Sequence, residues 1–305
     1  MMVSLKTLGA FTSEELLLKA KQEGFYLAVK EEFQKLTSVE EKNQNYHFNL
    51  PQNRCKNRFM HIPCPDFSRV LLNGNEDSYI HANYLYNVDS DYSEFGFIAT
   101  QTPLENTAAD FYQMVWEKSR IIVMLERMML HKCYQYWKPF PGKQMIAGNF
   151  KITTVYVVNY DHYVLTTLSI KHMPSGKVKK VNHYLYTRWP MYGIPNCEKK
   201  FFEFLQVIRR KNYFLCQKYI DCYYITVHCN SGVGKTGVFC AIMNGMKSFE
   251  KYGKVNLFEI VRCIRSTRPL SVTSLNQYKF CYKLLIYYSS HVRTIFNKNS
   301  VIKMM

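Results

Sequence analysis

One short stretch near the end of the chain limits the fold more than any other feature. Residues 223–227 have the β-branched and aromatic composition of a strand, residues 236–249 have the apolar spacing of a helix, and a glycine-containing loop joins them. A loop that ends on a helix N-terminus directs backbone N–H groups and the positive end of the helix dipole toward one point. The stretch therefore predicts an anion-binding loop between a buried strand and a helix.

Two kinds of loop fit this pattern. A nucleotide-binding loop reads Gly-x-x-x-x-Gly-Lys-Ser/Thr, and Gly234-Lys235-Thr236 would be its end, but its first glycine would fall at Cys229. A cysteine-phosphatase loop reads His-Cys, five residues, Arg, Ser/Thr, and every position from His228 agrees except that Lys235 replaces the arginine. The second pattern fits better, with Cys229 as a nucleophile whose thiolate form the helix stabilises. Taken singly, Cys229 is equally well explained as a small buried residue and Lys235 as a solvated one.

This loop resembles that of the tyrosine-specific protein phosphatases, and the resemblance covers roughly residues 25–290. Further segments follow in the order found in that family: Lys56-Asn57-Arg58-Phe59, Tyr79-Ile80-His81-Ala82-Asn83, Phe97-Ile98-Ala99-Thr100-Gln101-Thr102-Pro103-Leu104, Lys132-Cys133-Tyr134-Gln135-Tyr136-Trp137, Trp189-Pro190-Met191 and Asn276-Gln277-Tyr278-Lys279-Phe280. Within the family, the short polar N-terminus, lysine-rich composition and degenerate motifs most resemble the tyrosine phosphatase-like proteins of bracoviruses.

We expect an α/β fold, with a highly twisted mixed β-sheet flanked by helices. Apolar patterns predict strands at 69–72, 79–80, 97–100, 121–125 and through 151–186, and helices at 106–118 and 199–210. No repeat or linker divides the chain, so we expect a single domain over residues 1–305, with an N-terminal helical segment at about 12–45 and a core at about 50–290. The N-terminal helices are expected to pack as a lid.

The resemblance implies a mechanism, and two substitutions interrupt it. In the family a thiolate attacks phosphorus, an arginine grips two oxygens, an aspartic acid protonates the leaving tyrosine oxygen and a glutamine-aligned water releases phosphate. Cys229 keeps the nucleophile, but Lys235 cannot make the planar two-pronged contact of an arginine. Met191 stands at the general-acid position and has no proton to give. Gln277 keeps one glutamine of the water-positioning loop, whereas Thr273 aligns with the other.

The resemblance also assigns the rest of the site. The phosphate-binding loop would consist of Asn230, Ser231, Gly232, Val233, Gly234, Lys235 and Thr236. The acidic residues that brace the family's arginine are expected to be missing, because residues 125–132 are shorter than the corresponding family segment. Phe59 would flank a substrate ring, and His61 replaces an aspartate that holds the peptide backbone. The plainer alternatives are a core aromatic for Phe59 and a helix-capping or surface amide for Gln277.

Composition and cysteine spacing bear on the cellular location, metal binding and nucleic-acid binding of this chain. It has 40 Lys and Arg against 23 Asp and Glu, a formal net charge of +17, spread along the sequence without a nucleic-acid-binding motif. No signal peptide or membrane span is evident, and the ten cysteines lack C-x-x-C pairs and metal-ligand spacing. We therefore expect a cytoplasmic protein, in the host cell if viral, with reduced thiols, no cofactor, no metal and no specific nucleic-acid partner.

Three functions remain open. The leading hypothesis is a pseudophosphatase, not an enzyme, that binds phosphotyrosine proteins or other signalling partners of a host cell through the retained loop. The second is a slow tyrosine phosphatase that acts through Cys229. The third is a scaffold whose partner surface lies away from the pocket.

Overall fold

The computed structural model describes residues 8–38, 44–73, 75–85, 96–127, 133–219 and 224–302, with the side chains of 292–302 excepted. The strands are β1 (Phe11–Thr12), β2 (Ala82–Leu85), β3 (Gly96–Gln101), β4 (Ser119–Met124), β5 (Gln144–Ala147), β6 (Phe150–Asn159), β7 (Tyr163–His172), β8 (Val178–Tyr186), β9 (Tyr224–Cys229) and β10 (Lys254–Val255). The α-helices are α1 (Ser13–Lys19), α2 (Phe25–Ser38), α3 (Tyr46–Asn49), α4 (Ala108–Lys118), α5 (Glu198–Lys218), α6 (Gly234–Tyr252), α7 (Leu257–Thr267) and α8 (Leu275–Ile302).

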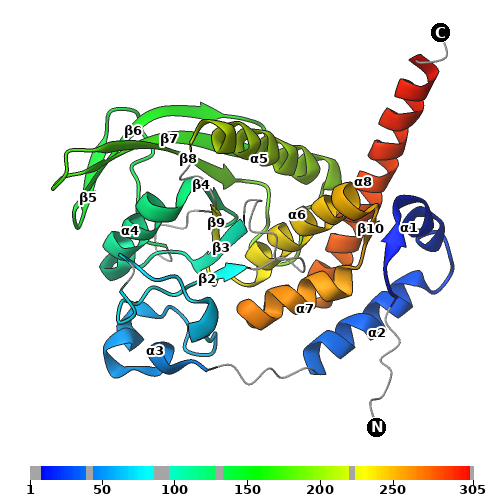
Figure 1. Cartoon of the computed structure of the whole chain (residues 1–305), viewed down its shortest axis with the longest axis horizontal. Coiled ribbons are helices and arrows are strands. Elements are labelled where there is room, and N and C mark those ends of the chain that lie inside the picture. The colour runs from blue at the N-terminus through cyan, green and yellow to red at the C-terminus, as the bar shows by residue number, and fades with distance from the viewer. Residues whose placement is uncertain are drawn as a thin grey trace.

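Within these residues eight strands form one mixed sheet in the order β2-β3-β9-β4-β8-β7-β6-β5 (Figure 1). The neighbours β3, β9, β4 and β8 pair in parallel, and β2, β7, β6 and β5 add antiparallel strands at either side. β9 pairs along both edges, with β3 and β4, which fixes its end, and all its residues after Tyr224 are buried. The mixed sheet flanked by helices is the fold predicted from the sequence.

Alternating side chains of β4 show how the layers form. Ile121 and Val123 enter the core beneath α5, α6, α7 and α8, whereas Ile122 and Met124 enter the core beneath α4 on the other face. All four side chains are fully buried. Successive residues of a strand point to opposite faces, and in β4 both sets are apolar. This is typical of a strand covered on both sides, and it explains the continuous apolar run at 121–125.

The N-terminal helices do not form a lid. Helices α1 and α2 pack against α8, α2 also packs against α7, and β1 pairs with β10 (Figure 1). Buried Glu32 of α2 accepts hydrogen bonds from the hydroxyls of Tyr278 and Tyr282 of α8, both at 2.6 Å. The lid prediction failed because it ignored the apolar surface of α8, which these helices cover.

Two predicted strands are also absent from the described sheet. Residues 69–72 form only isolated bridges, such as Arg69 to Asn83, and Tyr79-Ile80 has no strand pairing. Buried side chains there are held by a polar network instead, including the bonds from Arg69 to the Ser78 and Glu76 carbonyls. None of the described helices is both long enough and apolar enough to cross a bilayer.

Candidate functional site

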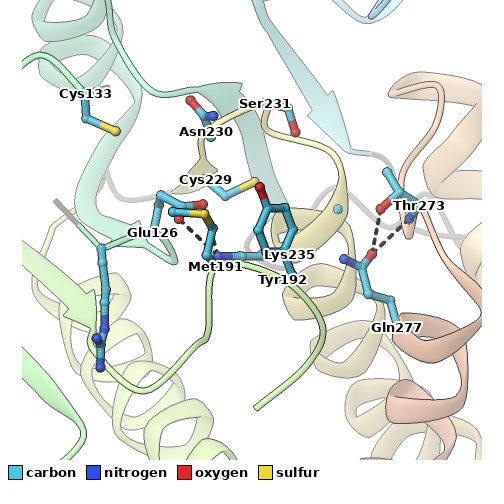
Figure 2. Close-up of a pocket in the computed structure, with 12 residues that line it drawn as sticks. Glu126, Cys133, Met191, Tyr192, Cys229, Asn230, Ser231, Lys235, Thr273 and Gln277 are labelled. Carbon is cyan, nitrogen blue, oxygen red and sulfur yellow. Dashed lines mark hydrogen bonds and ion pairs between the residues drawn. The ribbon is translucent and has the colours of Figure 1, made fainter. Parts of the chain in front are cut away.

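The predicted anion loop lies at the C-terminal end of β9, where helix α6 begins. Cys229 is the last residue of β9 and is 3% exposed. Its Sγ accepts hydrogen bonds from the Gly232 backbone N–H and the Thr236 hydroxyl, both at 3.3 Å. These two donors fix the position of the sulfur at the start of α6. Figure 2 shows Cys229 at the centre of the residues that line the cavity.

Glycine is required at the turn of this loop. Gly232 has φ +72°, and a Cβ at this position would lie 2.2 Å from the Thr100 carbonyl oxygen. The Thr102 backbone N–H fixes the strand side of the loop by donating to the carbonyls of Cys229 and Asn230 at 3.0 and 3.2 Å. The chain can therefore curl around the sulfur only because position 232 has no side chain.

A fully buried arginine holds the loop from behind. Arg268 donates to the carbonyls of Gly232 and Ser231 at 3.2 and 3.1 Å, and to the side chains of Asn83 at 2.8 Å and His81 at 3.0 Å. These bonds occupy loop carbonyls on the side away from the cavity. The sequence reasoning missed Arg268, because nothing in its spacing marks it as a neighbour of a loop more than thirty residues earlier.

Behind Cys229 lies a buried chain of neutral hydrogen-bonding groups. His228 contacts the Thr102 hydroxyl at 3.1 Å and the Tyr136 hydroxyl at 2.6 Å, and Tyr136 contacts His183 at 2.7 Å. Burial lowers the pKa of His228 well below its usual value, with the neighbouring His183 and Arg58 acting in the same direction. Burial also lowers the pKa of His183 to about 3. The imidazoles next to the nucleophile are therefore neutral and act as structural partners.

The expectation that no acid braces the loop cation is wrong. Glu126, just after β4, places both carboxylate oxygens 3.1 and 3.2 Å from the Lys235 Nζ, and both side chains are largely buried. Figure 2 shows this ion pair beneath Cys229. Sequence comparison of segment lengths could not place Glu126, because the pairing depends on where β4 and α6 meet in space. Residues 128–132 of that segment, with Lys132 of the proposed motif, lie outside the described residues.

Met191 lies at the rim of the cavity on the loop after β8. The loop is anchored by Trp189, which is 1% exposed, packs on Phe201 and donates its indole N–H to the Gly193 carbonyl at 3.1 Å. The tip is open: Met191 is 41% and Tyr192 83% exposed. A thioether has no proton to donate, so Met191 cannot act as an acid at this rim.

Gln277 lies in the first turn of α8 and lines the cavity. Its Oε1 accepts hydrogen bonds from the Thr273 N–H and hydroxyl, at 2.9 and 3.0 Å. The amide oxygen is therefore used within its own turn, as the capping alternative proposed, while the side chain still faces the loop at Gly234. Both Gln277 and Thr273 appear to the right of the loop in Figure 2.

The proposed substrate-ring residues do not line the cavity. Phe59 is partly buried, His61 is exposed, and their rings lie 5.7 Å apart, but neither is among the lining residues. Their segment is nevertheless tied to the strand beside the loop, because the Arg58 N–H donates to Gln101 Oε1 at 2.9 Å. Arg127 and Cys133 line the cavity and were not proposed from the sequence.

Together these groups enclose a cavity of about 270 Å³. Its lining residues are Glu126, Arg127, Cys133, Met191, Tyr192, Cys229, Asn230, Ser231, Gly234, Lys235, Thr273 and Gln277. The arrangement combines a sulfur nucleophile, the start of a helix and one buried lysine, and such a set suits a phosphate or another small oxyanion.

Comparison with known proteins agrees with this geometry. Residues 53–287 match the model of the protein-tyrosine phosphatase family. The chain is 32% identical over 247 residues to tyrosine phosphatase H2 of Microplitis demolitor bracovirus, covering 77% of this chain and 75% of that protein. It is 31% identical over 269 residues to mouse tyrosine-protein phosphatase non-receptor type 9, covering 83% of this chain and 45% of that protein. With human receptor-type tyrosine-protein phosphatase epsilon, identity is 34% over 273 residues, or 85% of this chain and 38% of that protein. The chain thus spans less than half the length of these two mammalian relatives.

Proposed function

The chain belongs to the protein-tyrosine phosphatase family, and from that premise we propose that it is a pseudophosphatase, which binds phosphotyrosine proteins with little or no turnover. One observation carries the proposal: the loop that cradles phosphate is fully built, whereas the two groups that stabilise the transition state are replaced. The cradle consists of Cys229 with its two donors and a loop held by Arg268. The replaced groups are Lys235 and Met191.

Lys235 supports binding more than catalysis. Its ammonium group is buried against Glu126, so part of its charge is already neutralised by that carboxylate. An ammonium group is a point charge, whereas a guanidinium makes two parallel bonds that follow the phosphoryl oxygens into the transition state. Losing such a contact typically lowers the rate by about 100- to 1,000-fold.

Met191 removes a second contribution to turnover, the protonation of the leaving tyrosine oxygen. Tyrosinate, with a pKa of about 10, is a poor leaving group unless a positioned acid protonates it. General-acid catalysis is worth about 100- to 10,000-fold. Among the described cavity residues, the only carboxylate is Glu126, and it is paired with Lys235. Both losses affect turnover, and neither removes the N–H groups that hold a phosphate.

The bracovirus relative supports a setting for this binding. A phosphotyrosine-binding chain delivered to a host cell would shield signalling phosphoproteins in the host cytoplasm from active phosphatases. This setting depends on the similarity to that viral protein alone.

The experiment is a binding measurement with a tyrosine-phosphorylated peptide and the same peptide without phosphate. We expect the phosphorylated peptide to bind at least about 10-fold more tightly in fluorescence polarisation, with inorganic phosphate as competitor, because only the phosphate can use the loop. Lys235→Met should weaken binding, and Arg188→Met, an exposed cation outside the cavity lining, is the control. Equal affinity for both peptides would reject the pocket-binding function and favour a scaffold.

A slow phosphatase is the second candidate, and the two donors to the Cys229 sulfur favour it. Activated aryl phosphates need no leaving-group acid, so the thiolate could still be phosphorylated by them. Turnover of such a substrate that Cys229→Ser abolishes would support this candidate. Equal turnover by both proteins would exclude it.

A further inference from the structure

Tyr192 places a tyrosine side chain at the mouth of a cavity that suits phosphotyrosine. It is 83% exposed and lines the cavity. Figure 2 shows its hydroxyl end directed toward the loop that carries Cys229. Among the exposed tyrosines of the described residues, it alone lines the cavity; the others are Tyr26, Tyr46, Tyr156, Tyr160, Tyr213 and Tyr252.

The segment around Tyr192 is irregular and exposed. Residues 187–197 form neither helix nor strand, and 191–193 are all exposed. Gly193 has φ +90°, and a Cβ built there would meet nothing within 4 Å. The buried Trp189 holds the start of the segment, so movement of the tip would keep Tyr192 near the cavity. An exposed, irregular segment of this kind can enter the active site of another enzyme.

The charges around Tyr192 favour a phosphate at its end. The preceding residue is Met191, where a carboxylate would repel a phosphate. The cavity offers the start of α6 and Lys235, and its only described carboxylate, Glu126, is paired. A phosphate on Tyr192 would therefore find N–H donors and the Lys235 ammonium group inside the same cavity.

We propose that Tyr192 is a phosphorylation site and that phosphotyrosine 192 occupies the cavity of its own chain, closing it to other phosphotyrosine proteins. A tyrosine kinase would transfer the γ-phosphoryl group of ATP to the Tyr192 Oη. The Oη–P bond forms, the bond between phosphorus and the β,γ-bridging oxygen breaks, ADP leaves, and the phenolic proton passes to a base of the kinase. This regulation uses the same cradle as the proposed function and rests on it.

Tethering makes self-occupation competitive. A group held by a short linker reaches its site with an effective concentration on the order of 1 mM. A free phosphotyrosine peptide at micromolar concentration must compete against that local concentration. We therefore expect phosphorylation of Tyr192 to weaken binding of a free phosphopeptide by at least about 10-fold.

The test compares two full-length proteins in which phosphotyrosine is incorporated at position 192 or at position 213. Tyr213 is the matched control, because it is 68% exposed and lies on α5 away from the cavity lining. Both proteins carry Cys229→Ser, so that neither can use its own thiolate. The first readout is polarisation with a phosphotyrosine peptide, and the second is the rate at which an added active tyrosine phosphatase releases phosphate.

Self-occupation predicts peptide binding at least about 10-fold weaker for the 192 form than for the 213 form. It also predicts that the added phosphatase releases phosphate more slowly from position 192 than from position 213. Local structure alone would predict the opposite order, because position 192 lies in an irregular segment and position 213 in a helix. Lys235→Met should speed release from position 192 several-fold. Equal peptide affinity and unprotected phosphate at 192 would overturn the inference while leaving peptide binding by the unmodified chain intact. If the unmodified chain binds no free phosphopeptide, the proposed function is rejected, and closure of the cavity against other phosphotyrosine proteins is overturned with it.

Discussion

Two loops meet at one cavity, and the fold holds them in different ways. The loop from Cys229 to Thr236 is fixed by β9, by α6 and by Arg268, and most of its residues are buried. The loop after β8 is anchored by Trp189, and its tip at 191–193 is exposed. The first loop is part of the packed core, whereas the second carries its side chains on an exposed tip that is tied to the core through the bond from Trp189 to the Gly193 carbonyl.

This difference explains which features could change without loss of the fold. Substitution of Gly232 or Arg268 would disturb backbone packing, so a change in the cradle would lower the stability of the fold. Met191 is 41% exposed at the cavity rim, and Lys235 keeps a buried ion pair with Glu126. The chain can thus carry Lys235 and Met191 while the loop from Cys229 to Thr236 keeps its shape.

The largest effect should come from restoring the catalytic groups. Because Glu126 already braces position 235, Lys235→Arg together with Met191→Asp should raise the turnover of a phosphotyrosine peptide by about 1,000-fold, through an oxyanion grip and a leaving-group acid. Steady-state phosphate release measures it, with Met191→Asn as the control that cannot donate a carboxylic proton. No rise in the double variant would mean that the cradle itself is defective.

A second test places alanine at one glycine of each loop. Gly232→Ala should destabilise the protein by roughly 3–5 kcal/mol, because its Cβ would meet the Thr100 carbonyl and φ is positive. Gly193→Ala meets nothing and should cost only about 1–2 kcal/mol for the positive φ. Urea unfolding of both variants measures the two costs. Similar values would contradict the claim that the two loops are held differently.

A third test removes the buried support of the cradle. Arg268→Met removes the Arg268 hydrogen bonds to the carbonyls of Ser231 and Gly232 and to the Asn83 side chain, so the free energy of unfolding should fall by about 3 kcal/mol. Arg188→Met, near the second loop, should leave the urea midpoint nearly unchanged, since its ion pair with Asp161 is exposed. If both variants behave alike, Arg268 is not the brace proposed.

The smallest expected effect is the loss of stability at low pH through two buried histidines near the cradle. Burial lowers the pKa of both His81 and His183 to about 3, against about 6.5 in the unfolded chain. Their neutral state therefore contributes full stability above pH 6.5, and this contribution is lost as the pH falls from 6.5 toward 3. Each should cost about 2 kcal/mol at pH 5. Urea unfolding at pH 7 and pH 5 should show a smaller pH loss in His183→Gln than in the parent; an equal loss would exclude His183 as a source.

Sequence alone predicted the parts of this molecule that depend on local pattern. The run from β9 through His228 to α6 follows from a strand, a glycine loop and a helix in succession, and the apolar run at 121–125 predicted a buried strand. The lid prediction was wrong because an amphipathic pattern predicts that one helix face is buried but not which surface it packs against. The roles of Glu126 and Arg268 were not predicted, because their partners are 109 and 36–37 residues away in the chain. Such pairings depend on tertiary structure.

The account is tested most directly by the turnover of the unmodified chain on a tyrosine-phosphorylated peptide, measured beside Cys229→Ser. We predict that phosphate release by the two proteins is the same within error, while the unmodified chain still binds the peptide. Rapid release by the unmodified chain that disappears in Cys229→Ser would contradict the account, because Lys235 and Met191 would then support the chemistry that we infer they have lost.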